Sequence, residues 1–213
     1  MIQMTEINQE FIEQSVKKLD KADIALSAIP TFPLYMEQMR QFINHEAGGA
    51  KRKDTEENIS DVFSKAMINN YTKVGLLNPP ENKKYNRDHI LMLLLINQLK
   101  NVLAINDIKL LFEPILDLSN PDIKDDIISI EDIYDTFLKI KDDEYRDAGR
   151  DFAEKFKIIK EKTQHIADDD KQDLAEDFLI VMMLVAEANI AKRLAEDIID
   201  EIFKKRKAIK KND

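Results

Sequence analysis

The scarcity of turn-forming residues is the strongest constraint on the fold of this chain. Its 213 residues include only four glycines and six prolines, whereas an all-β protein needs many tight turns built from such residues. Hydrophobic residues make up 44% of the chain and charged residues 34%, a balance typical of a globular protein with a real core. The composition therefore predicts an all-α fold.

Several classes of protein are disfavoured at this stage. The chain contains no cysteine, which excludes disulfides, thiolate zinc sites and thiol nucleophiles. Its first residues lack the basic and apolar regions of an export signal. The longest uncharged apolar runs, 90–96 and 178–186, are far shorter than the roughly 18 residues that cross a bilayer. We therefore expect a cytoplasmic protein without a membrane span.

Charge is distributed unevenly along the chain. The net charge of −9 argues against a polyanionic partner, since phosphate binding depends on Lys and Arg displacing counterions. Residues 38–112, however, hold eleven Lys or Arg against eight Asp or Glu, which leaves 21 against 33 for the remainder. This asymmetry is typical of a nucleic-acid module attached to an acidic domain.

Hydrophobic periodicity divides the chain into helices separated by Pro and Gly. A boundary at about 114–121, marked by Pro114 and Pro121, predicts three units: an N-terminal helical arm (1–29), a first domain (30–115) and a helical C-terminal domain (116–213). The expected helices are 9–26, 34–44, 59–73, 89–103, a short one opened by Asn106, one from the capping box Ser129–Asp132 to about Lys141, 145–164, and a long one from 170 to about 208.

The most specific pattern lies between the helices 59–73 and 89–103. Gly75 stands where a helix C-terminus favours a left-handed residue. Pro79 and Pro80 exclude helix, residues 83–85 are expected to form a small ribbon or wing, and Asp88 is expected to cap the next helix.

This succession resembles a winged helix-turn-helix. The segment Ile68-Asn-Asn-Tyr-Thr-Lys-Val-Gly-Leu-Leu77 looks like the second helix and exit of MerR-type regulators, and residues 84–90 and 105–111 resemble the wing and the closing helix of that group. More closely, residues 67–73 and 80–85 with His89 are similar to the DUF1836 family of bacterial proteins, which has been likened to MerR regulators. The resemblance covers about 35–113 and implies a MerR-like winged helix-turn-helix on residues 30–115, with dimerisation or signal sensing in the C-terminal domain.

The resemblance also implies a double-stranded DNA partner, a homodimer and a role in transcription regulation. A helix of this kind lies in the major groove, where asparagine can bond adenine and cations can meet phosphates. Tyr85 is expected either to bond a phosphate or to pack the wing against the body. The candidate DNA-binding residues are Lys65, Asn69, Asn70, Lys73, Lys83, Lys84, Tyr85 and Arg87.

Other interpretations of the same residues stay open. Asn69 and Asn70 are equally compatible with a solvated helix face, Lys83 and Lys84 with a solvated turn, and Tyr71 is expected in the core. Asn69 also stands where MerR-type regulators carry arginine. The alternative hypothesis is therefore a protein-interaction adaptor that kept the winged-helix scaffold without DNA binding.

Catalytic and metal-binding patterns are missing from the sequence. His45, His89 and His165 each lack a second ligand at helical spacing. The acidic run 168–170 is expected to cap a helix. Without a glycine-rich phosphate loop or a nucleophile motif, the sequence predicts no enzyme, no metal and no cofactor.

The run 178–186 is apolar on all sides of its expected helix. Such a helix must be covered by other helices or by a second copy of itself. We expect it to form the core of its own domain, with a dimer seam as the alternative.

Overall fold

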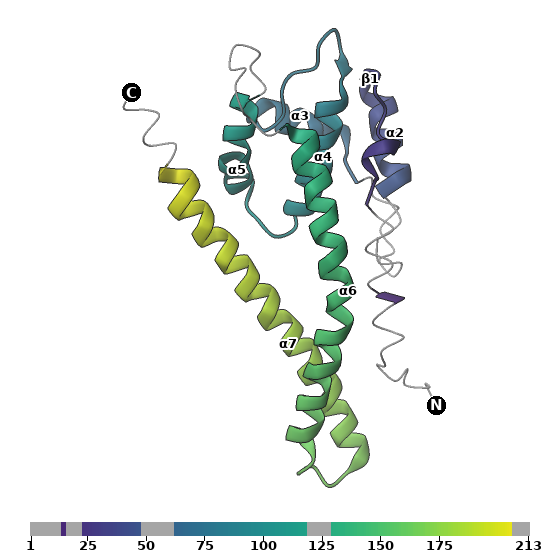
Figure 1. Ribbon diagram of the computed structural model, residues 1–213, viewed down its shortest axis with the longest axis vertical. Helices are drawn as coiled ribbons and strands as arrows, with labels where there is room; N and C mark the ends of the chain where they lie inside the picture. The colour runs from purple at the N-terminus through teal and green to yellow at the C-terminus, as the bar shows by residue number, and fades with distance from the viewer. Residues whose placement is uncertain (1–13, 16–22, 48–61, 119–128, 206–213) are drawn as a thin grey trace.

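The computed structural model describes residues 14–15, 23–47, 62–118 and 129–205, without the side chains of 115–118. The described part is mostly helical, as the composition predicts. Most of the expected arm helix 9–26 lies outside the described residues. In chain order the elements are the 3-10 turn η1 (Leu26–Ala28), β1 (Leu34–Tyr35), α2 (Met36–Ala47), α3 (Lys65–Lys73), β2 (Lys84–Tyr85), α4 (Arg87–Leu99), α5 (Ile105–Leu118), α6 (Ile130–Thr163), α7 (Asp169–Ile198) and the π-helical turn η3 (Ile199–Phe203) (Figure 1).

Helix α4 is the centre of the main core. Every residue from His89 to Ile96 is buried, as a helix that is apolar on nearly all sides requires. Side chains from α2, α3, α5 and the first turns of α6 surround it, including Met39, Ile68 and Tyr134. The short helices and the sheet therefore lie at one end of the long α6 (Figure 1).

The one sheet in the described chain is a two-stranded antiparallel ribbon. Leu34 pairs with Tyr85, and Tyr35 pairs with Lys84. A further bridge joins Glu81 to Lys84 across a tight turn whose two central residues have positive φ, as a type I′ turn requires. The expected ribbon at 83–85 is therefore present, and its partner strand comes from before α2.

Several predicted helix boundaries are wrong, including the end of α4, which is at Leu99 rather than at 103. Helix α3 begins at Lys65 rather than at 59, because Ser64 is its N-cap and residues 62–63 are not helical. Asn86, not Asp88, caps α4. Helix α5 begins at Ile105, so Asn106 lies inside its first turn, and α5 continues through Pro114.

Helix α6 is one helix of 34 residues where the sequence predicts two. Its beginning is as expected, since Ser129 Oγ accepts a hydrogen bond from the Asp132 backbone. The polar stretch at 141–145 does not interrupt it, and Arg146 pairs there with Asp142 and Asp143, one turn away.

Helix α7 packs on α6 only near the hairpin that joins them and then diverges from it (Figure 1). A small second core of Phe152, Ile159 and Ile180 marks this contact, and η3 then reaches α5. The predicted core position of 178–186 is wrong: Phe178 is 64% exposed and Val181 56%, while Ile180 is buried.

Candidate nucleic-acid interface

Helix α3 has one buried and one exposed face. Ile68 and Tyr71 enter the core, as expected for Tyr71. The exposed polar side chains recur at spacings of four, one and three residues, which places them on one face of the helix together with the exposed Ala66. These four polar residues are Lys65, Asn69, Asn70 and Lys73.

The segment before α3 is held by three side chains. Arg40 Nε donates to the Phe63 carbonyl at 3.1 Å, and Asn44 Oδ1 accepts from the Phe63 N–H at 3.3 Å. Lys100 Nζ donates to the Val62 carbonyl at 2.7 Å and lies 4.4 Å from the Phe63 ring centroid. These contacts fix where α3 starts on the body of the protein.

The C-terminal end of α3 is fixed in the same way. Gly75 has φ +72°, the left-handed conformation expected from the sequence. The N–H groups of Leu76 and Leu77 both bond the Tyr71 carbonyl, at 2.8 and 3.2 Å. Lys109 Nζ, from α5, donates to the Val74 carbonyl at 2.6 Å. Both ends of α3 are thus tied to the core, so its polar face is held in a defined orientation.

The ribbon presents two further lysines. Lys83 and Lys84 are both exposed, and Lys84 Nζ lies 5.3 Å from the ring centroid of Tyr35 on the paired strand. Lys83 sits in the turn with φ 64°. The chemistry available on α3 and the ribbon is therefore amide hydrogen bonding together with cationic attraction for phosphate.

Two of the candidate residues are engaged inside the fold. Tyr85 is 3% exposed, and its ring meets the ring of His89 edge-on at 5.3 Å. Burial raises the pKa of the Tyr85 phenol. Of the two expected roles of Tyr85, the structure has the packing of the ribbon against the body.

Arg87 is a clamp between segments. Its Nε bonds Glu131 Oε1 at 2.6 Å, its Nη2 bonds the Leu26 carbonyl at 2.9 Å, and its Nη1 bonds the Ile29 carbonyl. Its side chain is 18% exposed. A guanidinium engaged in three directions is withdrawn from the polar face of α3. The spacing of residues in the sequence does not indicate that Arg87 has these long-range partners.

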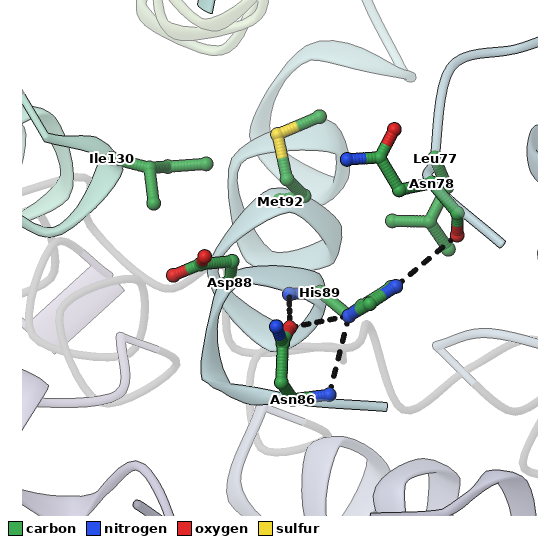
Figure 2. Close-up of a pocket in the computed structure, with 7 residues that line it drawn as sticks. All are labelled: Leu77, Asn78, Asn86, Asp88, His89, Met92 and Ile130. Atoms are coloured by element: carbon green, nitrogen blue, oxygen red, sulfur yellow. Dashed lines mark hydrogen bonds between the residues drawn. The ribbon is translucent and has the colours of Figure 1, made fainter. Parts of the chain in front are cut away.

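Beside the ribbon, a pocket surrounds His89 (Figure 2). The Asn86 side chain accepts from the His89 backbone at 3.2 Å, and His89 Nδ1 accepts from the Asn86 backbone at 3.2 Å. Nε2 faces the Asn78 carbonyl at 3.2 Å. Burial is the main cause that lowers the pKa of His89. The pocket is lined by Leu77, Asn78, Asn86, Asp88, His89, Met92 and Ile130.

This arrangement is structural, because both imidazole nitrogens are used by backbone groups. The capping box formed by Asn86 and His89 has a sequence signal, an N-cap residue followed three positions later by a side chain that can reach back. The sequence interpretation missed it by assigning the cap to Asp88. Across the described ranges, no group of three His, Asp or Glu side chains is placed to hold a metal ion.

A second polar contact that the sequence does not signal joins the chain near residue 23 to α6. Lys141 Nζ bonds Asp23 Oδ1 at 2.7 Å and Gln98 Oε1 at 3.1 Å, and the Lys141 and Asp23 side chains are 14% and 13% exposed. Nearby, the Tyr134 hydroxyl donates to the Ile24 carbonyl at 2.8 Å. Residues 23–29 are therefore part of the same packed unit as the start of α6.

These features define a mostly helical protein in which a short polar helix lies beside an antiparallel ribbon. The chain belongs to the DUF1836 family, described as a domain of unknown function, whose model matches residues 24–137, more than half of the chain. The match begins at the segment clamped by Arg87 and ends within α6. No curated protein and no solved structure matches the chain. None of the described helices is long and apolar enough to cross a membrane.

Proposed function

We propose that this protein is a cytoplasmic, DNA-binding, transcription-regulator-like protein that uses a MerR-like winged helix-turn-helix on residues 30–115. The observation that carries the proposal is the exposed face of α3, whose lysines and asparagines all point away from the core while both ends of the helix are anchored. The ribbon with two exposed lysines lies next in the chain. A helix and a wing of this kind suit major-groove and backbone contacts respectively.

The residues divide into two roles. In this proposal Asn69 and Asn70 contact base edges, where asparagine bonds adenine N6 and N7 in a bidentate manner. Lysines at the two ends of the helix and on the ribbon meet phosphates and set the register. The proposed interface therefore consists of Lys65, Asn69, Asn70, Lys73, Lys83 and Lys84, without Tyr85 and Arg87.

The proposal is tested by measuring the affinity of the purified chain for fragments of its source genome at two salt concentrations. We expect selective binding that weakens with salt. A Lys83→Ala/Lys84→Ala variant should bind all fragments more weakly and reduce the salt slope by about 2, because each phosphate contact contributes about 1. Asn70→Ala should instead lower the discrimination between fragments.

A matched control removes the same charge elsewhere. Lys157 and Lys162 are exposed on α6, so Lys157→Ala/Lys162→Ala tests whether the effect is merely one of net charge. The proposal requires this variant to keep the wild-type salt slope. Absence of selective binding by the folded wild-type chain, or equal weakening in both double variants, would contradict it.

Two observations favour a second function, that of a protein-interaction adaptor. Arg87 and Tyr85 make their contacts inside the fold. The whole chain also carries a net charge of −9, which disfavours binding to the negatively charged DNA backbone. In that case the same exposed lysines of α3 and the ribbon would contact an acidic protein surface. A well-folded chain that binds no duplex but loses a protein partner upon Lys83→Ala/Lys84→Ala would support this alternative.

A further inference from the structure

The antiparallel ribbon has one buried and one exposed face. Leu34 and Tyr85 form the buried pair, whereas the paired Tyr35 and Lys84 are exposed, because residues directly opposite each other on two strands share a face. Tyr35 is 52% exposed, and Lys84 Nζ lies 5.3 Å from its ring centroid. The exposed face therefore holds a phenol and an ammonium group side by side, with Lys83 next along the turn.

The polar groups of this face are available to an external ligand. Within the part of the chain that the structure describes, the Tyr35 hydroxyl makes no hydrogen bond and neither ribbon lysine makes an ion pair. Glu37, two residues after Tyr35, pairs with Arg40 at 2.8 Å. By contrast, most of the lysines of α6 and α7 are paired with a carboxylate. The ribbon thus presents cations that the protein itself does not neutralise.

We infer that the Tyr35 hydroxyl donates a hydrogen bond to a phosphate of bound DNA, with the Lys84 ammonium group on the same phosphate. This inference rests on the proposed function and brings β1 into the interface. Tyr35 thereby takes the phosphate role expected of Tyr85, whose side chain is buried. A hydroxyl donor and a cation suit one phosphate, because both stabilise its anionic oxygens. The contact of Lys84 with the Tyr35 ring orients the two groups before binding, which lowers the entropic cost.

A contact of this kind strengthens binding without selecting a sequence. The phosphate backbone carries no base identity, so the ribbon would set the position of α3 on the duplex. The Tyr35 hydroxyl is neutral and displaces no counterion, whereas the Lys84 ammonium group does. Loss of the hydroxyl should therefore lower affinity at an unchanged salt slope, and loss of the ammonium group should lower both.

The test measures binding of the full chain to short fluorescein-labelled duplexes, one from its source genome and one of random sequence. Tyr35→Phe should weaken binding to both about 10-fold, because one hydrogen bond to a charged group is lost, and should keep the wild-type salt slope. Lys84→Ala should reduce that slope by about 1. Tyr145→Phe is the matched control, since Tyr145 lies on α6 and also has a lysine at its ring, with Lys141 Nζ at 5.1 Å; it should bind as wild type does.

A photo-cross-linker tests the contact itself. Tyr35→p-benzoylphenylalanine should form a covalent adduct with the labelled duplex under near-ultraviolet light. The same replacement at Tyr145 should form none. Urea unfolding of Tyr35→Phe should match wild type, which distinguishes a DNA contact from mere support of the ribbon.

The outcomes separate this inference from the proposed function. A wild-type chain that binds no duplex overturns both. Wild-type binding that Tyr35→Phe leaves unchanged overturns the inference alone, because the lysines and asparagines of α3 would then suffice. A Tyr35→Phe variant that loses stability and affinity together, without cross-linking from position 35, shows that Tyr35 supports the ribbon and does not meet the phosphate.

Discussion

His89 shows how one side chain joins two segments that flank the ribbon. Its Nδ1 accepts from the Asn86 backbone at the start of α4, and its Nε2 faces the Asn78 carbonyl on the way to the ribbon. Nδ1 also faces Asn86 Oδ1, so both ring nitrogens are engaged within the fold. Burial lowers the pKa of His89 and so favours the neutral imidazole.

This geometry predicts a pH dependence of stability. Because the folded-state pKa is lower than the ordinary value of 6.5, the unfolded chain binds the proton more readily. Stability is then largest above about pH 6.5 and falls as the pH decreases toward the folded-state pKa. In urea unfolding at several pH values, the stability advantage of wild type over His89→Gln should shrink from about pH 7.5 to about pH 5.5.

The control for this prediction is His45→Gln, because the His45 side chain is 85% exposed. It should follow the wild-type profile. A His89→Gln variant with the same pH profile as wild type would show that the buried imidazole is not the titrating group responsible.

At the scale of elements, the end of α3 rests on a single glycine. Gly75 has φ +72°, and a Cβ there would lie 3.5 Å from Lys109 Nζ, an ordinary contact. The cost of a side chain is therefore conformational rather than steric. Gly75→Ala should lower the free energy of unfolding by about 1 kcal/mol, measured as a lower midpoint in urea.

A second glycine in this chain gives the opposite expectation. Gly149 lies inside α6, with no atom within 4 Å of an added Cβ. Gly149→Ala should stabilise the protein by about 0.5–1 kcal/mol, because glycine loses more backbone entropy in a helix. If both variants shift stability in the same direction, the left-handed requirement at Gly75 is not what ends α3.

The elements were partly predictable because local chemistry sets some of their ends. Ser129 and Gly75 act locally and were assigned correctly. Pro114 is an example of a wrong prediction. The sequence indicates that the helix ends near this proline, whereas α5 continues past it to Leu118. The continuity of α6 through 141–145 has no comparable local signal, because the exposed ion pairs of Arg146 with Asp142 and Asp143 contribute little each.

At the scale of the whole molecule, Arg87 holds three segments together: the start of α4, the chain at 26–29, and α6 through Glu131. Arg87→Lys keeps the charge but cannot reach three directions, since lysine lacks the planar fork. We expect a loss of about 1–3 kcal/mol in the free energy of unfolding, measured by urea titration.

Arg150→Lys is the matched control, because Arg150 is 78% exposed and pairs only with Asp147 among the contacts described. It should change stability by no more than about 0.5 kcal/mol. If Arg87→Lys is equally neutral, the clamp does not contribute to holding α6 on the core.

The sequence by itself determined the helical class, the apolar helix that becomes α4, the left-handed Gly75, the ribbon near 83–85 and the exposed lysines and asparagines of α3. Each of these follows from interactions within a few residues along the chain, such as periodicity, caps and turn conformations. Only the tertiary structure decided that Arg87 and Tyr85 are engaged internally, that Asp23 meets Lys141, and that the apolar run of α7 stays exposed. These depend on which distant segments meet, and apolar periodicity shows that a helix must be covered without showing by which surface.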